Sequence, residues 1–418
     1  MRILHISWEF PPTIVGGLGT FTMELTRQLV VMGHDVTVYT LNRENKYPTR
    51  DLWKGVEVHR PMIVDFTDAF NIFAGEELKR WGEGLKFFSD VAVYNMLSAS
   101  KVVNEQIRKD NAKFDVVDSH DWLGAMAGVA IKEETGLPMI FHMHSTEKGR
   151  SMGKGSRVVE DIEYMGAERA DCVITVSYAM RDHLISLGFP GNKITVCWNG
   201  VDEKKYSMDN FNKSEISELR KRYGIGEKDN MLLFVGRLTP VKGVQNLIEA
   251  MPEIVKGYPN TKLVVLGVGE LEESMRKRIK ELGMDDRVIM RAEFVDEHER
   301  ILHYAASDVV VLPSFYEPFG IVCIEAMSMG KPVVVGAKGV SGFREQVIPQ
   351  GEKQCGVHID PYNKDDIAWG VSAVLCCPDR RELMGKNARE RVLEEFTWEK
   401  IAKKTFAVYE GVVGRHGK

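Results

Sequence analysis

The strongest constraint on the fold is a repeated pattern in which a short apolar run, a loop and a longer amphipathic stretch follow one another. Many of the runs are apolar throughout, as in strands that are buried on both faces of a parallel sheet. Amphipathic stretches between such strands form the helices of βαβ units. The predicted strands are Ile3–Ser7, Val36–Thr40, Val56–Arg60, Asp115–Ser119, Met139–His142, Asp171–Val176, Ile194–Cys197, Met231–Val235, Lys262–Leu266, Arg287–Met290, Asp308–Leu312 and Pro332–Val335.

The chain has 418 residues, which is more than one ordinary core holds, so two α/β domains in tandem are predicted. The polar stretch Asp202–Asp229 separates them. Ligands of open parallel sheets bind beyond the carboxyl ends of the strands, and clefts between domains favour ligand sites. Functional residues are therefore expected just after strands.

Composition excludes several classes of protein. The net charge of −5 arises from 55 basic and 60 acidic side chains without blocks of like charge, so no nucleic-acid partner is predicted. The six cysteines form no Cys-x-x-Cys pair and indicate free thiols in a reducing compartment. The first residues do not have the pattern of a signal peptide, and no run approaches the length that spans a bilayer, so a cytoplasmic protein is expected.

The first candidate site is the glycine loop Pro11–Thr20, which contains Gly16 and Gly17 and follows the first strand. Glycines between a strand and a helix let the backbone approach an anion, and the helix N-terminus adds N–H groups. A tight turn without a ligand has the same pattern, and the sequence leaves both interpretations open. The loop does not match the dinucleotide fingerprint, so a dehydrogenase is not favoured.

The second candidate lies at the first strand–helix junction of the second domain, where Arg237 and Lys242 stand five residues apart in a turn that ends with a glycine. A guanidinium and an ammonium group can together neutralise a diphosphate leaving group. A surface turn with two solvated charges is the alternative. The position at the functional edge of the sheet favours the diphosphate site.

The third candidate is the segment Pro313–Ala326, in which Glu317 precedes Pro318 and Glu325 follows eight residues later. The proline is predicted to start a helix that contains Glu325. Carboxylates accept hydrogen bonds from vicinal hydroxyls, so the pair could hold a sugar ring and a ribose. The backbone N–H groups of Phe319, Gly320 and Ile321 would suit an anion or a sugar oxygen.

The fourth candidate consists of His120-Asp121-Trp122 and of His142 with His144, each at the end of a predicted strand. Histidines at i and i+2 of a strand point the same way, so zinc has to be considered. No cysteine or carboxylate completes a set at metal-ligand spacing, and no metal site is predicted. Polar contacts to a substrate are favoured over zinc.

Taken together, these motifs resemble the retaining glycosyltransferases of the glycogen synthase, starch synthase and sucrose-phosphate synthase type. The resemblance covers essentially the whole chain, and His-Asp-Trp at 120–122 is similar to the glycogen synthase branch. It implies the GT-B fold, with two Rossmann-like domains facing across a deep cleft. The implied domains are an acceptor-side domain at 1–205, joined by the crossing C-terminal helix at about 398–418, and a donor domain at 206–397.

The resemblance also implies roles for individual residues. The catalytic residues would be His144, Arg237, Lys242 and Glu317. The substrate-binding residues would be Gly16, Gly17, Asp121, Phe319, Gly320, Ile321 and Glu325. Arg237 and Lys242 would bind the departing diphosphate, Glu317 the sugar hydroxyls and Glu325 the ribose, while the nucleobase would lie near Ala292–Val295. No metal or other cofactor is required in that family.

The expected reaction is transfer of glucose from UDP-glucose or ADP-glucose to the non-reducing end of an α-1,4-glucan, as in glycogen biosynthesis. Bacterial glycogen synthases and plant starch synthases, which this chain resembles, carry a lysine two residues before the first glycine of the loop. This chain has Ile14 at that position. That departure weakens a preference for ADP-glucose. No carboxylate nucleophile is evident, so retention by front-face attack is expected.

The acceptor is less constrained. A mobile loop at Ser145–Arg157 and the aromatic residues Phe66, Phe70, Phe73 and Trp81 are candidates for glucan contacts, although the aromatic residues could equally be core. The stretch Glu76–Lys109 could pack a domain or a homo-oligomer interface. Alternatives are an enzyme of the same fold that acts on a small sugar, sugar phosphate or lipid, a nucleotide-sugar epimerase, and a non-catalytic protein that binds sugar nucleotides.

Overall fold

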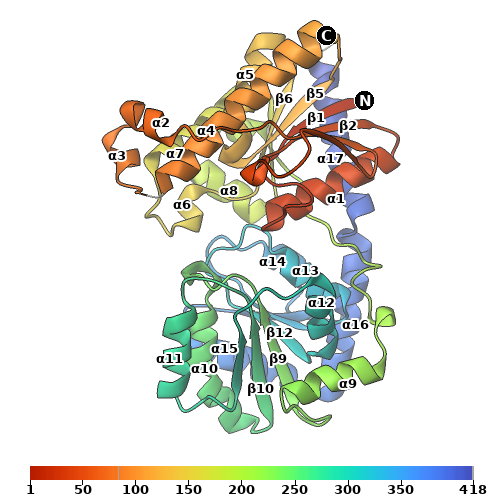
Figure 1. Ribbon diagram of the computed structural model, residues 1–418. Helices are drawn as coiled ribbons and strands as arrows, with labels where there is room; N and C mark the ends of the chain where they lie inside the picture. The colour runs from red at the N-terminus through yellow and green to blue at the C-terminus, as the bar shows by residue number, and fades with distance from the viewer. Residues whose placement is uncertain (83, 417–418) are drawn as a thin grey trace. The chain divides into compact units, whose positions relative to one another are not determined.

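Two sheets of mainly parallel strands organise the chain in the computed structural model, which describes residues 1–82 and 84–416 (Figure 1). Each sheet is the centre of one compact unit. Unit 1 comprises Met1–Trp198 and the chain from Trp398 onward, and unit 2 comprises Asn199–Thr397. The sequence places the first boundary at 205/206, and the structure divides at 198/199.

The sheet of unit 1 has the strand order β3-β4-β2-β1-β5-β6-β7-β8. All neighbours are parallel except β3, which runs antiparallel to β4. Strands β5 and β6 are buried at every position, including Asp118, Ser119 and His120 at the end of β5 and His142 in β6. The strands are β1 (Arg2–Ile6), β2 (Asp35–Tyr39), β3 (Arg50–Trp53), β4 (Val56–His59), β5 (Val116–His120), β6 (Met139–Met143), β7 (Cys172–Thr175) and β8 (Ile194–Val196).

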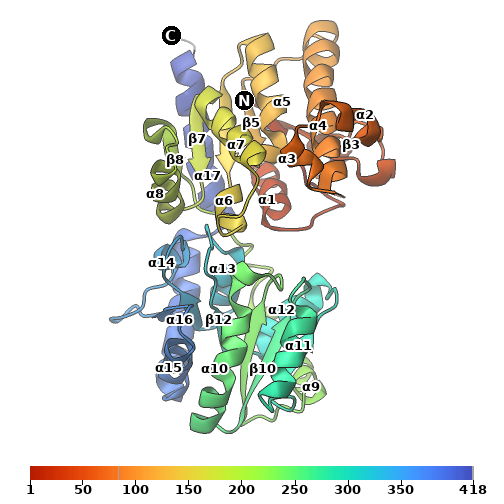
Figure 2. The ribbon, with the colours of Figure 1, turned by 90° about the vertical axis from the view of Figure 1, so that its left-hand side faces the viewer.

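Helices cover both faces of this sheet (Figures 1 and 2). Helices α1 and α17 pack together on one face, and α4, α5 and α7 pack in a row on the other. The helices are α1 (Gly17–Val31), α2 (Thr67–Phe73), α3 (Glu76–Lys79), α4 (Gly84–Ser100), α5 (Asp121–Thr135), α6 (Glu147–Arg150), α7 (Arg157–Arg169), α8 (Tyr178–Ser186) and α17 (Trp398–His416), and Lys101–Lys109 is a π-helical continuation of α4.

The last helix joins unit 1 from the far end of the sequence. Trp398, Ile401 and Tyr409 of α17 are buried in the same core as α1 and the first strands. The Tyr409 hydroxyl donates a hydrogen bond to the Asp118 carboxylate on β5. Helix α17 is therefore a structural part of the first unit.

The sheet of unit 2 is parallel throughout, with the order β11-β10-β9-β12-β13-β14. The strand order reverses at β9 and β12, which lie next to each other at the centre. In doubly wound sheets this switch point is where loops diverge and ligands bind. The strands are β9 (Asn230–Val235), β10 (Thr261–Leu266), β11 (Val288–Arg291), β12 (Val309–Leu312), β13 (Val333–Gly336) and β14 (Gly356–Ile359).

Helices α10, α11 and α15 share one hydrophobic core with this sheet, whereas α9 packs on α12 and α13 on α16 (Figure 2). Both faces are again covered, as a parallel sheet requires. The helices are α9 (Lys213–Arg222), α10 (Val244–Gly257), α11 (Glu272–Glu281), α12 (Glu297–Ala306), α13 (Ile321–Ser328), α14 (Phe343–Gln346), α15 (Lys364–Leu375) and α16 (Pro378–Glu395).

All twelve predicted strands are present, and β3 and β14 were not predicted. Strand β3 is an exposed edge strand that forms a hairpin with β4 through Lys54 and Gly55, both at positive φ. Its polar sequence carries no signal of a buried strand, because only β4 lies beside it. Strand β14 is the short edge strand of the second sheet.

Candidate functional site

The loop after β9 carries the two predicted cations of unit 2. Arg237 is exposed, and Lys242 lies five residues later in a half-buried position. Gly243 follows with φ of +67°, and a Cβ atom there would lie 1.9 Å from the carbonyl oxygen of Pro313. Only glycine fits this close approach. It brings the loop after β9 against the loop after β12.

The loop after β12 continues through Pro313–Gly320 into helix α13. The sequence predicts a helix start at Pro318, but α13 begins at Ile321. The reason is Gly320, which has φ of +93° and lies where a Cβ atom would be 2.2 Å from the Phe343 ring. This left-handed residue separates the Glu317-Pro318 turn from the helix. Glu325 lies inside α13, as predicted.

Lys242 and Glu317 meet where these two loops touch. The Lys242 Nζ donates a hydrogen bond of 2.5 Å to Glu317 Oε2, and the Ser314 hydroxyl donates to the same oxygen over 3.2 Å. Their side chains are 22% and 12% exposed. The predicted diphosphate cation and the predicted sugar-binding carboxylate are thus an ion pair that a ligand can still reach.

Phe319, Gly320 and Ile321 lead into the first turn of α13. The Phe319 side chain is buried, and its carbonyl accepts a hydrogen bond from the Gln346 side chain. The first N–H groups of an α-helix have no acceptor within the helix. The structure therefore places helix-terminal N–H groups within a few residues of Glu317, as the sequence analysis expects for an anion or sugar site.

Glu325 is the centre of a buried network that was not predicted. Tyr206 donates to Oε1 over 2.7 Å, while Arg300 and Tyr304 donate to Oε2 over 2.7 and 2.8 Å. The carboxylate raises the pKa of Arg300 further above its ordinary value, and burial raises that of Tyr304. Glu325 thus has three partners from distant segments, which its position in the sequence could not indicate.

In unit 1, the glycine loop after β1 is organised by Glu9, a residue that the sequence analysis missed. Glu9 Oε2 accepts hydrogen bonds of 3.0 Å from the backbone N–H groups of both Val15 and Gly16. Gly16 and Gly17 are exposed at the start of α1. The loop N–H groups of Val15 and Gly16 thus donate to a carboxylate of the same chain, and the phosphate site at this loop stays a prediction.

Asp121 begins helix α5 with φ of +50°, a rare conformation for a residue other than glycine. Its Oδ1 accepts a hydrogen bond of 2.7 Å from the backbone N–H of His144. Burial raises the pKa of Asp121. The structure thus brings together the two predicted sugar contacts of unit 1, and Asp121 fixes the backbone that carries His144.

His144 is the outermost member of a histidine cluster. His5, His120 and His142 are fully buried, together with Asp118, whereas His144 is partly accessible. The rings of His142 and His144 are parallel within 3°, as expected for positions i and i+2 of a strand. Because His120 and His142 do not reach the surface, only His144 of the three predicted histidines can meet a substrate.

The cluster contains donor atoms that could hold a metal ion. His120, His142 and His144 form one group whose ligand atoms lie within 4.8 Å of one another, and His5, Asp118 and His120 form another. The sequence argument that no carboxylate completes a set was therefore wrong, because the sheet brings Asp118 of β5 beside His5 of β1. That no metal is required stays a prediction.

The segment Ser145–Arg157 follows His144. The sequence predicts a mobile loop, but the structure gives the segment a short helix, α6, with Thr146 as its N-cap. Glu163 accepts hydrogen bonds from the Glu147 N–H over 2.8 Å and from Arg150 over 3.3 Å. Burial raises the pKa of Glu163 to about 8, although Arg150 opposes the shift.

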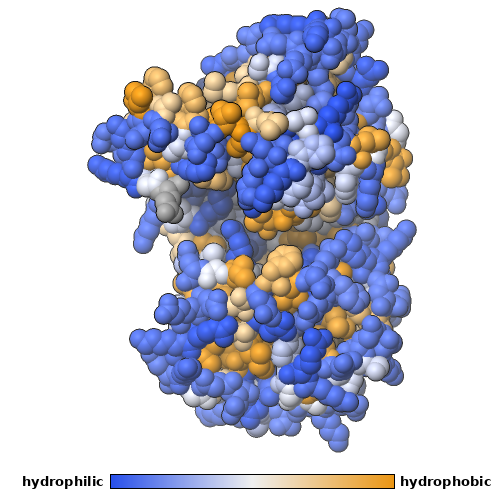
Figure 3. All heavy atoms as spheres, viewed as in Figure 1, coloured by the Kyte–Doolittle hydropathy of each residue, from blue (hydrophilic) through white to orange (hydrophobic). Residues whose placement is uncertain are grey.

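The aromatic candidates for acceptor contacts divide into two pairs. Phe66, the N-cap residue of α2, and Phe73, its last residue, are 44% and 79% exposed. Apolar surface is visible in the region of α2 (Figure 3). Phe70 and Trp81 instead pack on Phe88 of α4. The second pair therefore has the packing role that the sequence analysis kept as the alternative.

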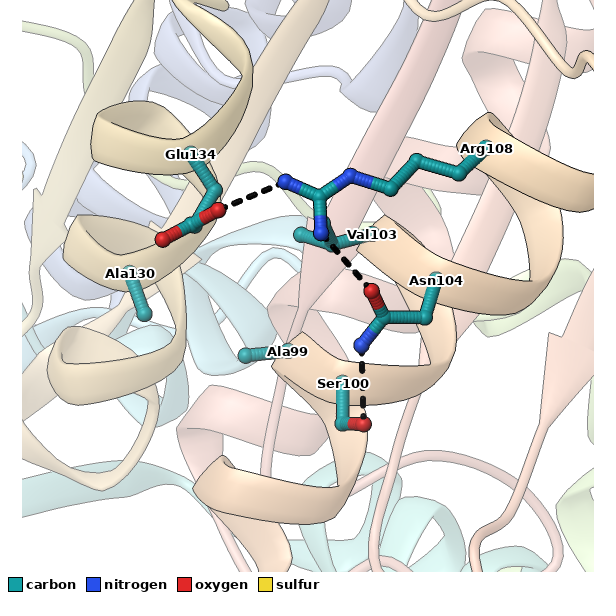
Figure 4. A pocket seen from close by; sticks show the side chains of 7 residues that line it. All are labelled: Ala99, Ser100, Val103, Asn104, Arg108, Ala130 and Glu134. Carbon is teal, nitrogen blue, oxygen red and sulfur yellow. Dashed lines mark hydrogen bonds and ion pairs between the residues drawn. The ribbon is translucent and has the colours of Figure 1, made fainter.

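A small cavity of about 240 Å³ lies elsewhere in unit 1, between α5 and the end of α4 with its π-helical continuation (Figure 4). Arg108 donates hydrogen bonds across it to Glu134 over 2.7 Å and to Asn104 over 2.9 Å. Both charges in its lining are thus paired with each other. None of the predicted site residues lines this cavity.

Comparison with known proteins places this geometry in a class. The pattern of the family described as "Glycosyltransferase Family 4" matches residues 15–205, and that of "Glycosyl transferases group 1" matches residues 215–391. The fold matches sucrose-phosphate synthase from Thermosynechococcus elongatus with a TM-score of 0.81 at 23% identity, over 99% of both chains. It matches the catalytic domain of starch synthase IV from Arabidopsis thaliana with a TM-score of 0.77 at 18% identity, over 99% of both chains. The predicted GT-B fold of two Rossmann-like domains is confirmed.

Relatives align over almost the whole chain. An uncharacterized glycosyltransferase from Methanocaldococcus jannaschii is 33% identical, with 98% of both chains covered. Glycogen synthase from Mycobacterium tuberculosis is 31% identical, with 98% of this chain and 94% of its own covered. Alpha-maltose-1-phosphate synthase from Mycolicibacterium smegmatis is 28% identical, with 99% and 100% covered. The chain belongs to the group 1 glycosyltransferases and is a hexosyltransferase that uses nucleotide sugars.

Among the helices within residues 1–82 and 84–416, none combines the length and the apolar character needed to cross a bilayer.

Proposed function

We propose that this enzyme transfers glucose from UDP-glucose or ADP-glucose to the non-reducing end of an α-1,4-glucan, with retention of the anomeric configuration. The observation that carries the proposal is the contact between Lys242 and Glu317. Lys242, in the loop after β9, is a cation that can bind a diphosphate, and Glu317, in the loop after β12, is a carboxylate that can bind sugar hydroxyls. The glycogen synthase relative, aligned along nearly all of both chains, supports the glucan acceptor.

In this proposal the donor lies along the ends of the strands of unit 2. Arg237 and Lys242 bind the diphosphate, and the N–H groups of Phe319, Gly320 and Ile321 bind phosphate or sugar oxygens. Glu317 accepts hydrogen bonds from the hexose hydroxyls. Gly16 and Gly17 in unit 1 line the reacting centre, so that Glu9 competes with the diphosphate for the Gly16 N–H.

The nucleobase would lie in the loop that follows β11, at Ala292–Val295. Phe294 in this loop is 92% exposed, which is unusual for a phenylalanine and leaves its ring face open for a base. The ribose would meet Glu325, whose Oε1 accepts a hydrogen bond from Tyr206 and has a second lone pair for a further hydroxyl. Stacking on Phe294 does not distinguish uracil from adenine.

The proposed reaction is a front-face substitution. The bond between the anomeric carbon and the phosphate oxygen breaks, and the glucosyl group passes through an oxocarbenium-like state. The acceptor hydroxyl then bonds to the same face of that carbon, and its proton passes to the departing phosphate. Arg237 and Lys242 stabilise the negative charge that develops on the diphosphate, in the way that preorganised donors stabilise transition states. These two cations would make a divalent metal unnecessary.

A sugar phosphate is the second candidate acceptor. The relative named alpha-maltose-1-phosphate synthase aligns over its full length, and a glucosyl group plus glucose 1-phosphate would give the product in that name. The donor site in unit 2 would be the same for both acceptors. The distinction therefore depends on unit 1, in which the exposed Phe66 and Phe73 would suit a glucan.

The test is release of nucleoside diphosphate by the pure protein from UDP-glucose and from ADP-glucose, with EDTA present. Each donor is tested with glycogen, with glucose 1-phosphate and with neither. Release that requires glycogen, together with longer α-1,4-linked chains, supports the proposal and identifies the donor. Release that requires glucose 1-phosphate identifies the second candidate. Absence of release with both donors and acceptors contradicts the glucan synthase and favours another donor sugar or another acceptor.

A further inference from the structure

Three histidines form a chain through the core of unit 1. His5 Nδ1 lies 3.1 Å from His120 Nε2, and His120 Nδ1 lies 3.2 Å from His144 Nε2. They come from β1, from the end of β5 and from the residue after β6, which are neighbouring positions in the sheet. His5 and His120 are completely buried, and His144 is at the accessible end.

The rings face each other edge to edge, in line. The centroids of His5 and His120 are 5.4 Å apart with an interplanar angle of 16°, and those of His120 and His144 are 5.5 Å apart at 18°. In each pair the distance between the ring centroids equals the distance between the two nitrogens plus the radii of two five-membered rings. The centroids can be that far apart only if both nitrogens lie on the line between them, so each nitrogen points straight at its partner.

This alignment is that of N–H···N hydrogen bonds. Two imidazoles that share a tetrahedral metal ion direct their lone pairs to a third point off the line between them, at about 2.0–2.1 Å from each nitrogen. Here the line between the nitrogens is itself the lone-pair direction. The chain is thus a hydrogen-bonded relay, which we define as His5, His120 and His144.

The number of protons on each ring requires both hydrogen bonds of the relay to run in the same direction. A neutral imidazole has one donor and one acceptor, and burial lowers the pKa of His5 to about 4 and of His120 to about 3, so both are neutral at pH 7. If His5 donates to His120, then His120 donates to His144. The reverse direction would make His144 donate to His120 and His120 donate to His5.

The buried end of the relay distinguishes the two directions. His5 Nε2 is buried and has no hydrogen-bond partner among the described residues. If His5 donates through Nδ1, this atom is a bare lone pair, whereas the reverse direction makes it an orphan N–H group, which is rare in protein cores. The neighbouring His142 also leaves a lone pair, and not an N–H group, without a partner. Its Nδ1 lies 3.5 Å from the Asp118 carboxylate, which can only accept, so Nδ1 carries the proton and the unpartnered Nε2 is a lone pair.

We propose that His5 and His120 are positioning residues that hold His144 as the tautomer protonated on Nδ1. His144 then presents an N–H donor to an acceptor oxygen of the bound sugar nucleotide, a step that rests on the proposed function. The ring cannot easily turn, because Phe21 contacts it edge-on at 4.8 Å and His142 stacks on it at 4.7 Å. Asp118 accepts a hydrogen bond from Tyr409 of α17, and the same carboxylate oxygen lies beside His5, His120 and His142.

A matched pair of variants tests the relay. Asparagine places an amide nitrogen near the position of a histidine Nδ1, so His5→Asn keeps the first donor, whereas His5→Leu removes it. His142→Phe is the control, because it alters a stacked ring of the same cluster that lies outside the relay. The readout is the ¹⁵N spectrum of histidine-labelled, ligand-free protein at pH 7, with the His144 signals assigned by their loss in His144→Asn.

The wild type, His5→Asn and His142→Phe should show His144 protonated on Nδ1, and His5→Leu should shift it toward the Nε2–H tautomer. Turnover at saturating donor should fall about tenfold in His5→Leu, in line with loss of one hydrogen bond, and stay within about twofold in His5→Asn. A wild-type His144 protonated on Nε2, or an unchanged tautomer in folded His5→Leu, overturns the relay.

The wild-type spectrum alone decides the direction of the relay if His5→Leu does not fold. Because the spectrum needs no substrate, a failure of the relay is distinguishable from a failure of the proposed glucan synthase.

Discussion

The ammonium group of Lys242 donates a hydrogen bond of 2.5 Å to the carboxylate of Glu317, although 74 residues of sequence separate the two. Their encounter depends on Gly243, which lets the carbonyl of Pro313 lie where a Cβ atom would otherwise be. A diphosphate that binds Lys242 must therefore share this cation with Glu317. In the proposed function, the pair would couple the charge of the leaving group to the carboxylate that holds the transferred sugar.

Replacing Lys242 with alanine should lower turnover about 10²–10³-fold at saturating donor, because it removes one preorganised charge from the departing diphosphate. Nucleoside diphosphate release measures the effect. The control is Lys256→Ala, which removes an exposed lysine of α10 that pairs only weakly with Glu253 and should leave turnover unchanged. Turnover of Lys242→Ala near that of the wild type would contradict the assignment.

Replacing Phe294 with alanine should weaken binding of both UDP and ADP. Stacking of a base on an aromatic ring is worth about 1–3 kcal/mol, so the dissociation constants should rise about fivefold or more. Stability should not change, because the side chain is 92% exposed. Isothermal titration calorimetry measures the affinities, with Trp369→Ala on α15 as the control for loss of an exposed aromatic residue. Equal affinities in Phe294→Ala and the wild type would place the base elsewhere.

The sequence predicts the strands of this fold better than it predicts the contacts between distant side chains. Runs such as Met231–Val235 are predictable because both faces of their strands are buried, so hydrophobicity alone reveals them. The loops that carry Lys242 and Glu317 are predictable because parallel strands end at one edge of a sheet. The start of α13 at Ile321 is not predictable, because it depends on the packing of Gly320 against Phe343, the first residue of helix α14.

The hydrogen-bond partners of Glu9 and Asp118 could not be predicted either, because they come from other segments of the fold. Glu9 lies only six residues before Val15, yet nothing in its local pattern indicates that it accepts hydrogen bonds from the glycine loop. Asp118 was treated as part of a strand, and its position beside His5 follows only from the pairing of β1 with β5. A regular pattern reveals the backbone, whereas these contacts need the register of the sheet.

Replacing Glu325 with alanine should lower the free energy of unfolding of unit 2 by about 3 kcal/mol, because it removes the carboxylate that accepts three hydrogen bonds in a largely buried network. Arg300, 27% exposed, and two tyrosine hydroxyls would lose their acceptor. Tyr304→Phe, which removes one hydrogen bond to the carboxylate, should cost about half as much. Urea unfolding measures both. If Glu325→Ala costs no more than Tyr304→Phe, the network does not stabilise the fold.

Glu163 should make the stability of the protein depend on pH in a defined window. Its side chain is 3% exposed, and burial raises its pKa from about 4.5 to about 8. Between these values the folded protein holds a proton that the unfolded chain has released. The free energy of unfolding therefore falls as pH rises from about 4.5 to about 8, and the contribution levels off at higher pH.

Glu163→Gln cannot ionise, and its amide oxygen can still accept the hydrogen bond from the Glu147 N–H. The variant should therefore gain stability over the wild type as pH rises through the window, by up to about 1.4 kcal/mol for each unit of pKa shift. Urea unfolding of both proteins from pH 5 to pH 9 measures the difference. Glu168→Gln, at an exposed position of the same helix, should show no such trend. Parallel profiles for Glu163→Gln and the wild type would mean that Arg150 keeps Glu163 ionised in the folded protein.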